Sequence, residues 1–410
     1  MKTKINKIRN IKLPTRTFSF KEVLIISVIT IGLGLFAGAT ITHLSMRHNS
    51  LSRYQTMQLD NNLRDFITVY NALVNNYYRE LDRNTLISSA LKGMLGDIDD
   101  PYTVYMDQVD TSDFSRRLNG RFTGVGMEIV RDQEGNVIVL RPFDSGPAYK
   151  AGIRTGDIIV KVDDSNLEDK SLTDVANMIQ GPIDTFVNIT IKREGKEQSF
   201  RIKRATINIR SVTSHIIEEE GSKIGYININ IFSSLTTTQF NEELKSLQRE
   251  GIDSLIIDVR SNRGGYLNSV HEILDNFLTR QDVLYQIETS RRTTKRFGSA
   301  EKRSDLPIVV LVNDTTASAA EILAAALKES YGAKLVGTKT LGKGTVQQPL
   351  NLSSGAMVKF TTQNWLTPKG KSLNESGITP DYLVTLNERF YREPTPANDN
   401  QLQKAIELLK

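Results

Sequence analysis

The sequence contains no cysteine among its 410 residues. This absence excludes disulfide bonds, thiolate zinc sites, a cysteine nucleophile and lipid attachment at cysteine. Histidine is also scarce, with four residues, so a catalytic site with a histidine base has few candidates. Hydrophobic residues at 39% and charged residues at 24% indicate neither wholesale disorder nor many membrane spans. At about 150 residues per domain, the length predicts two or three domains.

The net charge of +5 is concentrated at one end of the chain. Residues 1–22 hold seven Lys or Arg and one Glu, which gives +6, so the rest of the chain sums to −1. A near-neutral body has no electrostatic footprint for a phosphate backbone, and no nucleic-acid partner is expected.

Residues 23–44 read VLIISVITIGLGLFAGATITHL and contain no Asp, Glu, Lys or Arg. As a helix this run would be about 33 Å long, enough to cross a hydrocarbon core. The basic leader before it (1–22) predicts a cytoplasmic N-terminus. We expect a single-pass protein of the cell membrane with an extracytoplasmic body. The run also fits a signal peptide cleaved after Ala39, but its continuation to Leu44 favours an uncleaved anchor.

The remainder of the chain shows four successive patterns. Residues 45–112 carry apolar side chains at helical spacing and predict a helical region. Residues 113–205 form short alternating runs broken by glycine, which predicts a β-rich module. Residues 206–386 alternate strand and helix patterns, as in an α/β domain. Residues 387–410 combine a polar link with an amphipathic helix whose partner is not evident from the sequence.

Ser318 is the first candidate for chemistry. It follows an apolar strand at 307–312 and lies near the start of an alanine-rich helix predicted over 317–331. Free backbone N–H groups and the positive end of the helix dipole suit a nucleophile whose substrate develops an oxyanion. Taken alone, the segment fits equally well an ordinary helix N-cap at Ser318 or Thr316.

A serine nucleophile needs a base. His215 lies in an alternating strand and His271 on a helix, and both contexts favour structural roles. Lys343 lies in a glycine-rich loop between Gly342 and Gly344, where the backbone can fold closely around it. A lysine base at neutral pH must be desolvated or lie near other cations. Spacing alone leaves Lys334 and Lys339 equally available. A phosphate-cradling loop is a rival interpretation, but the GxxxxGK[ST] pattern is absent.

The chain resembles the carboxyl-terminal processing peptidases, also called tail-specific proteases. These are PDZ-containing serine proteases with a Ser–Lys dyad. The resemblance runs from about Asp60 to Leu386 and rests on segments in the family's order. These are Asp99-Asp100-Pro101-Tyr102-Thr103-Val104-Tyr105, residues 123–126, 145–148, 151–157, 258–265 and 366–368, and the segments around Ser318 and Lys343.

The resemblance implies an α/β fold. Together with the sequence patterns above, this gives a protease core (206–386) with a mixed sheet and flanking helices, an inserted β-rich PDZ domain (113–205), a helical N-terminal region (45–112) and one transmembrane helix (23–44). It makes Ser318 the nucleophile and Lys343 the general base. Gln347 would orient the lysine. Backbone N–H groups of Gly265 and Ala319 would form the oxyanion hole.

By the same resemblance, the PDZ domain binds a substrate's C-terminal tail along a sheet edge. The loop Phe122-Thr123-Gly124-Val125-Gly126 would capture the terminal carboxylate. An apolar pocket would be lined by Met127, Ile129, Val175 and Met178, although part of this set also fits a simple core.

The implied function is a membrane-anchored endopeptidase of the cell envelope that cuts proteins with apolar C-terminal tails. No metal or organic cofactor is expected, and a homodimer or larger assembly is implied. The alternative is a non-catalytic PDZ adaptor with a protease-like fold. A third class is an α/β hydrolase in which Ser318 works with His215 or His271.

Overall fold

The computed structural model describes residues 61–144 and 146–410. The chain divides into two compact units, residues 1–87 and 88–410, and each is considered by itself. The predicted leader (1–22) and transmembrane helix (23–44) lie outside the described residues, as does Ser145. Within the described segments, no helix is both long and apolar enough to cross a membrane.

The predicted helical region contains α2 (Asn61–Asn76) and α3 (Arg83–Gly96). None of the residues of α2 is buried, and its apolar side chains include the exposed Leu63 and Phe66. A further helix, α4 (Gln108–Asn119), spans the domain boundary that the sequence placed after residue 112. It begins where the Asp107 side chain accepts from the Asp110 N–H, a standard N-cap.

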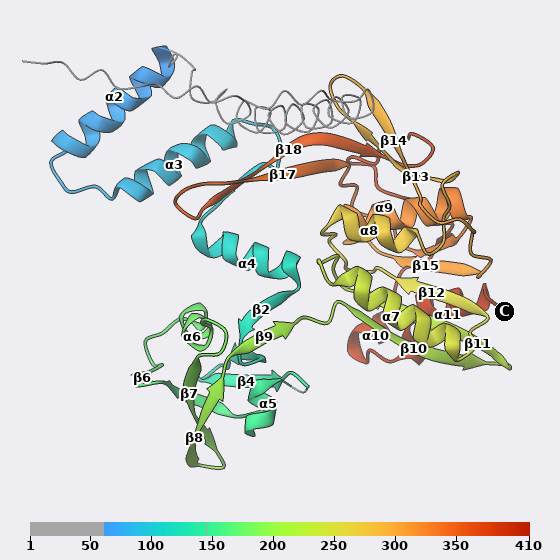
Figure 1. Ribbon diagram of the computed structural model, residues 1–410, viewed down its shortest axis with the longest axis horizontal. Coiled ribbons are helices and arrows are strands. Elements are labelled where there is room, and N and C mark those ends of the chain that lie inside the picture. Colours follow the sequence, from blue (N-terminus) through green and yellow to red (C-terminus); the bar gives the residue numbers. More distant parts are fainter. Residues whose placement is uncertain (1–60, 145) are drawn as a thin grey trace, which may run out of the picture. The chain divides into compact units, whose positions relative to one another are not determined.

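The β-rich module forms a six-stranded sheet in the order β3-β4-β5-β7-β8, with β6 paired to β5. Figure 1 shows its strands β4, β7 and β8 with the helices α5 and α6. Its strands are β3 (Met127–Arg131), β4 (Val137–Pro142), β5 (Ile158–Val162), β6 (Ser165–Asn166), β7 (Phe186–Arg193) and β8 (Lys196–Lys203). Its helices are α5 (Pro147–Ala151) and α6 (Leu172–Ile179). A ribbon of β2 (Arg121–Gly124) and β9 (Ala205–Asn208) pairs the two ends of the module, so it is inserted as a closed unit.

The α/β domain is built on a six-stranded mixed sheet in the order β10-β11-β12-β15-β16-β19. The strands are β10 (Val212–Glu219), β11 (Ser222–Ile229), β12 (Ser254–Asp258), β15 (Ile308–Val312), β16 (Lys334–Gly337) and β19 (Tyr382–Leu383). Only β10 runs antiparallel to its neighbour among these described strands. Every residue of β12 and β15 is buried, as their continuous apolar runs predict for strands covered on both faces.

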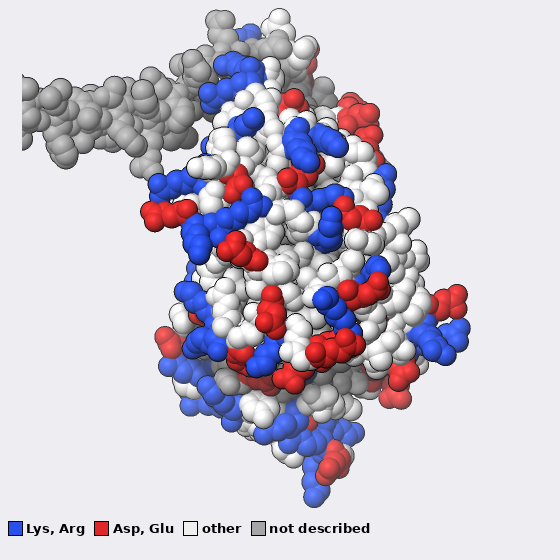
Figure 2. All heavy atoms as spheres, turned by 90° about the vertical axis from the view of Figure 1, so that its right-hand side faces the viewer, with Lys and Arg blue, Asp and Glu red and all other residues white. Residues whose placement is uncertain are grey.

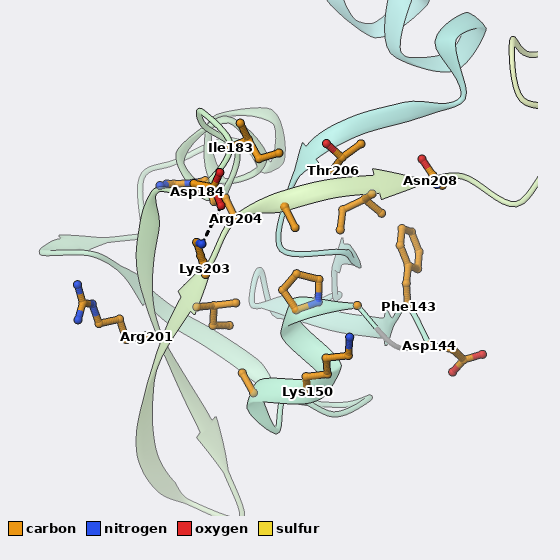
Figure 3. Close-up of a pocket in the computed structure, with 16 residues that line it drawn as sticks. Phe143, Asp144, Lys150, Ile183, Asp184, Arg201, Lys203, Arg204, Thr206 and Asn208 are labelled. Carbon is orange, nitrogen blue, oxygen red and sulfur yellow. Dashed lines mark ion pairs between the residues drawn. The ribbon is translucent and has the colours of Figure 1, made fainter.

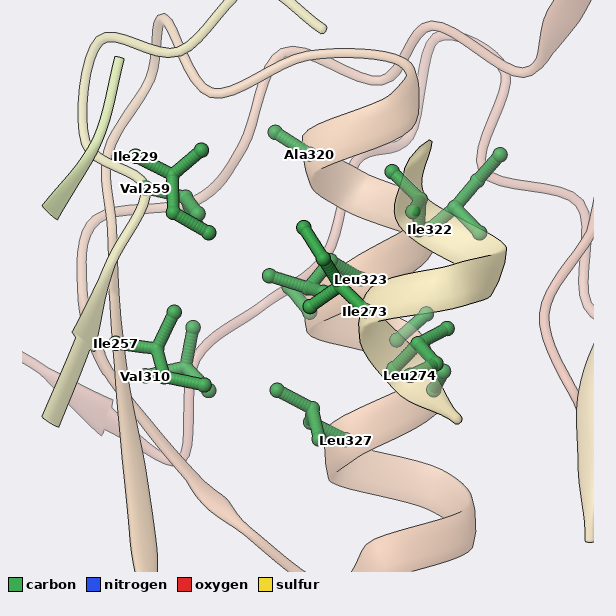
Figure 4. Packing of buried hydrophobic residues seen from close by; sticks show 14 of the residues in the cluster. Ile229, Ile257, Val259, Ile273, Leu274, Val310, Ala320, Ile322, Leu323 and Leu327 are labelled. Atoms are coloured by element: carbon green, nitrogen blue, oxygen red, sulfur yellow. The ribbon is translucent and has the colours of Figure 1, made fainter. Parts of the chain in front are cut away.

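Helices cover the two faces of this sheet. One face packs against α7 (Thr236–Arg249), α8 (Leu267–Leu274) and α9 (Ala319–Ala326). Figure 4 shows Ile257 and Val310 of the strands pointing toward Leu323 of α9. The alternate strand residues pack on the other face against α11 (Asn400–Glu407). This face is therefore the partner of the C-terminal amphipathic helix. The predicted helix 317–331 is divided, because α9 passes into a π-helix at Leu327–Tyr331.

The C-terminal segment also reaches the end of β12. It consists of α10 (Glu388–Arg392), a 3₁₀ turn (Pro396–Asn398) and α11. Arg260, just after β12, pairs with Asp258 at 2.7 Å and with Asp399 at 2.8 Å. Asp399 also caps α11 by accepting from the Leu402 N–H. Because a buried charge is costly unless it is paired, this cluster fixes α11 to the loop that follows β12.

A second sheet contains antiparallel pairs throughout its described strands. Its strands are β1 (Val104–Met106), β13 (Val283–Glu288), β14 (Thr293–Phe297), β17 (Thr345–Asn351) and β18 (Met357–Leu366). The sequence patterns did not predict this sheet. It matters for function because the Lys343 loop leads directly into β17.

Candidate active site

Ser318 lies at the turn between β15 and α9, as the N-cap residue of α9. Its backbone has φ 57° and ψ −119°, a conformation that non-glycine residues rarely adopt. Strained backbone of this kind is concentrated at functional sites, where the surrounding structure enforces it. The Ser318 N–H donates to Oε2 of Glu321 at 2.8 Å, which helps to hold the turn. Thr316 does not cap α9, because its hydroxyl donates to the carbonyl of Val259.

Glu321 is a fully buried carboxylate that joins the two halves of the site. Oε2 accepts from the backbone N–H groups of Ser318 and Lys343 at 2.8 and 2.9 Å. Oε1 accepts from the Thr340 hydroxyl and the Gly342 N–H at 2.5 and 2.8 Å. Four donors stabilise the buried charge. Sequence reasoning missed this residue, although a Glu three positions after a capping serine is a recognisable signal.

Lys343 is held by its backbone on the loop before β17. Its carbonyl accepts from the indole N–H of Trp365, the single tryptophan of the chain, at 2.8 Å. The sequence predicted that glycine beside Lys343 lets the backbone fold closely around it. At Gly342 a Cβ would lie 2.7 Å from the Gly377 nitrogen, which is too close for a side chain. Burial lowers the pKa of Lys343 to about 8, helped by the positive charge of Lys359 and opposed by Asp100 and Glu321. The lysine thereby approaches the pKa that suits a general base.

A cavity of about 420 Å³ brings the predicted catalytic residues together. Its lining includes all five of them: Ser318, Lys343, Gln347, Gly265 and Ala319. The alternative bases are not among the described residues that line it. His215 instead stacks near Tyr226 with ring centroids 4.6 Å apart, and His271 meets the edge of Tyr285.

Gln347 lies on β17, and its side chain is hydrogen-bonded within the second sheet. Its amide donates to the hydroxyls of Thr345 at 2.7 Å and Thr361 at 3.3 Å. Among the hydrogen bonds of the described residues, none joins Gln347 to Lys343 or Lys343 to Ser318. The cavity therefore gathers these three groups without a direct bond between their side chains.

The Gly264-Gly265 turn lies beside the nucleophile. A Cβ on Gly264 would lie 3.0 Å from the nitrogen of Ala319 and from Cβ of Ser318. Gly265 has φ 142°, and a Cβ there would lie 2.0 Å from the carbonyl oxygen of Phe232. No acceptor in residues 61–144 or 146–410 is bonded to the N–H of Gly265 or of Ala319. Two backbone donors are thus available next to Ser318, as an oxyanion hole requires.

The predicted tail-binding residues lie around β3 and α6. The segment 122–124 belongs to strand β2, and Val125 and Gly126 connect it to β3. Within the described segments, the N–H groups of Val125 and Gly126 have no acceptor. Val125 and Val175 are buried in the core of the module, whereas Met127, Ile129 and Met178 are partly exposed at its edge. These three remain accessible to a ligand along the edge strand β3.

A larger cavity, of about 700 Å³, opens on the opposite edge of the same module. Figure 3 shows that α5, β8 and β9 form its walls, with Lys203 paired to Asp184 at 2.7 Å. Its described lining includes none of the predicted catalytic or tail-binding residues. Volume alone therefore does not mark the chemical site.

The charged side chains of the surface are mixed in sign. On the face at the right of Figure 1, Figure 2 shows Lys and Arg interspersed with Asp and Glu.

The fold and the cavity define a serine-protease type of α/β core with an inserted PDZ domain. Three family descriptions match the chain: "Peptidase family S41" over residues 223–384, "PDZ domain" over 144–193 and "Activating protease CtpB N-terminal domain" over 29–110.

Two curated relatives come from Bacillus subtilis (strain 168). The carboxy-terminal processing protease CtpB is 35% identical over 369 residues, with 88% of this chain and 77% of that protein covered. The carboxy-terminal processing protease CtpA is 34% identical over 370 residues, with 90% and 77% covered. A solved photosystem II D1 C-terminal processing protease is 31% identical, with 78% and 86% covered and a TM-score of 0.46. The chain belongs to the carboxy-terminal processing proteases, the serine proteases of peptidase family S41, which confirms the resemblance.

Proposed function

We propose that this protein is a membrane-anchored endopeptidase that recognises protein C-terminal tails through its PDZ domain and cleaves peptide bonds with a Ser318–Lys343 dyad. One observation carries the proposal. Ser318, at a strained helix N-cap, shares a cavity with a lysine of lowered pKa and with two backbone N–H groups that have no acceptor in the described part of the chain. This combination supplies a nucleophile, a base and an oxyanion hole without a histidine.

The chemistry follows the positions of these groups. Lys343 takes the proton of the Ser318 hydroxyl as Oγ attacks the carbonyl carbon of the scissile bond. The N–H groups of Gly265 and Ala319 bind the oxygen that becomes negative. The ammonium of Lys343 then protonates the leaving amine, and a water activated by the same lysine releases the acyl group. Gln347 orients the amine in this scheme, and no metal or organic cofactor takes part.

Alanine substitutions test the dyad. We expect Ser318→Ala and Lys343→Ala each to abolish cleavage of a tail-bearing protein, measured by mass spectrometry of its C-terminus. His215→Ala and His271→Ala are the matched controls and should retain cleavage. Full activity in Lys343→Ala would overturn the dyad, and loss confined to a histidine variant would favour the histidine hydrolase. If the wild type binds tails but cuts none across several substrates, the adaptor alternative is correct.

The proposed tail site is the edge strand β3 with the connection at Val125 and Gly126. The N–H groups of these two residues, which have no acceptor among the described residues, suit a terminal carboxylate, and Met127, Ile129 and Met178 suit apolar tail residues. We expect an apolar peptide with a free C-terminus to bind at least tenfold more tightly than its C-terminal amide. Equal affinity in calorimetry would contradict carboxylate capture.

The setting of the enzyme is part of the same proposal. Residues 23–44 would anchor it in the cytoplasmic membrane, with the protease core in the cell envelope. We further propose that a second copy covers the exposed apolar side chains of α2, among them Leu63, Phe66 and Leu73. Membrane fractionation with protease accessibility tests the topology. Light scattering of the extracted full-length protein tests the dimer. A dimeric wild type beside a monomeric Leu63→Asp variant would support it.

A further inference from the structure

The Asp99-Asp100-Pro101-Tyr102 turn belongs to the family-like motifs, yet the proposed mechanism gives it no role. In the structure it lies against the general base. The Lys343 Nζ lies 4.5 Å from the centroid of the Tyr102 ring, within the range of a cation–π contact. Asp100 fixes the turn by accepting from the Tyr102 N–H at 2.9 Å and from the Thr103 hydroxyl at 2.6 Å.

The turn is bonded to the strands that carry the other groups near Lys343. The Thr103 hydroxyl accepts from the Thr361 N–H at 3.2 Å, and the Thr361 hydroxyl accepts from the amide of Gln347. Directly after the turn, β1 pairs with β18, with Val104 opposite Lys359. The ring of Tyr102, the amine of Lys343 and the amide of Gln347 therefore belong to one connected unit.

The Lys343 amine lies among charges of both signs, and the Tyr102 ring adds a further interaction with its ammonium form. Lys359 repels the ammonium from β18, whereas Asp100 in the turn and Glu321 on α9 attract it. An aromatic face stabilises a nearby cation and at the same time keeps water away from it. Burial and the carboxylates of Glu321, Asp100 and Glu375 raise the pKa of Tyr102, so its hydroxyl stays neutral at the pH at which Lys343 titrates.

We propose that Tyr102 is a positioning residue for the general base. Its ring holds the Lys343 side chain, excludes water from the amine and stabilises the ammonium that forms during attack. In that step the Ser318 O–H bond breaks, the proton moves to Nζ, and Oγ forms a bond to the substrate carbonyl carbon. The inference rests on the Ser–Lys mechanism proposed above and extends it to the N-terminal region of the chain.

The test compares Tyr102→Phe, Tyr102→Leu and Tyr102→Ala in the full-length protein. The rate of Ser318 phosphonylation by a fluorophosphonate probe, in which Oγ displaces fluoride from phosphorus, and the kcat and KM for a tail-bearing peptide are measured between pH 6 and 10. Tyr102→Phe keeps the aromatic face and should stay within about twofold of the wild type. Tyr102→Leu keeps the burial but loses the face, so kcat should fall about tenfold with KM unchanged.

The pH profile separates positioning from a structural role. The acid limb is the rise of kcat with pH as Lys343 loses its proton. Tyr102→Leu should move this limb to lower pH, because the aromatic face no longer stabilises the Lys343 ammonium. Tyr102→Ala should move it to higher pH, because water reaches the amine. Tyr105→Leu is the matched control, since Tyr105 lies three residues on and contacts Lys92 instead. Its acid limb should coincide with that of the wild type.

Several outcomes would overturn the inference. A wild-type kcat and acid limb in Tyr102→Leu would do so, as would an equal loss in Tyr102→Phe, because then the ring face is not what matters. Thermal unfolding checks each variant, and Tyr102→Met replaces Tyr102→Leu if the latter is unfolded. The two proposals fail separately: activity in Lys343→Ala refutes the dyad, whereas an inactive Lys343→Ala beside an unchanged Tyr102→Leu refutes only the role of the ring.

Discussion

Ser318 lies between two elements that are buried along their whole length, β15 and α9, whereas Lys343 leads into β17, whose residues are half-buried or exposed. The nucleophile half of the site is thus held by a strained φ at Ser318, by the Gly264-Gly265 turn and by the side-chain carboxylate of the buried Glu321. The base half also receives side-chain contacts from distant segments, since the Tyr102 ring lies near the Lys343 amine and the Thr361 hydroxyl accepts from the Gln347 amide. We infer that substitutions in the first half cost stability, and that those in the second half chiefly change activity.

The strongest test of this contrast is Gly265→Ala. A methyl group there would lie 2.0 Å from the Phe232 carbonyl, which already accepts from the Tyr266 N–H, so the turn must break. We expect a loss of more than about 3 kcal/mol in the free energy of unfolding together with loss of activity. Gly332→Ala is the control, because Gly332 also has positive φ but no atom within 4 Å of its Cβ position. It should lose only about 1–2 kcal/mol in urea unfolding.

Glu321→Gln should have the next largest effect. The carboxylate accepts hydrogen bonds from four donors. In the glutamine variant an amide NH₂ would face two of these donors, and at least one buried N–H would lose its acceptor. We expect a loss of about 2–3 kcal/mol in stability, and a kcat about 100-fold lower as the two halves shift. Glu329→Gln is the control, because the Glu329 carboxylate accepts a hydrogen bond from the backbone N–H of Lys369. This variant should leave both the stability and kcat unchanged. A stable and fully active Glu321→Gln would remove Glu321 as the link between the halves.

Lys343→Met should reverse the sign of the stability change. The pKa of Lys343 falls from 10.5 to about 8 in the folded protein, so a charged amine opposes folding below pH 8. Between pH 8 and 10.5 the unfolded chain binds more protons, and wild-type stability rises with pH. We expect Lys343→Met to be inactive and, at pH 7, about 1–3 kcal/mol more stable after allowance for partial exposure. Lys339→Met, at an exposed lysine of the same loop, should leave stability unchanged.

Sequence patterns predicted the buried half of the molecule well. Continuous apolar runs gave β12 and β15, and alternation gave the strands of the PDZ module, because burial leaves a periodic record in the sequence. The second sheet left no such record. Strand β17 reads TVQQPLN and is mostly exposed, and its pairing with β18 depends on tertiary contacts.

The site divides in the same way. Ser318, Lys343, Gln347 and the Gly264-Gly265 turn were predicted because each lies in a short segment that resembles the family's motifs, and the structure places them around one cavity. Tyr102 lies in one of the motifs that carry the resemblance but received no predicted role, and Thr361 was not singled out, because their contacts join distant parts of the chain, as between Thr103 and Thr361, 258 residues apart. A single sequence holds no signal for such a contact. Glu321 falls between these cases, since its capping position is local but its bonds to the Lys343 loop are not.

The ion pair between Arg260 and Asp399 joins two residues that lie 139 positions apart. Arg260 belongs to the loop after β12 that leads to Gly265, and Asp399 caps the helix α11, which covers the second face of the central sheet. The cap of α11 and the loop of the candidate oxyanion donor therefore share one buried charge cluster. We expect a substitution that loosens α11 to affect the candidate site through this loop.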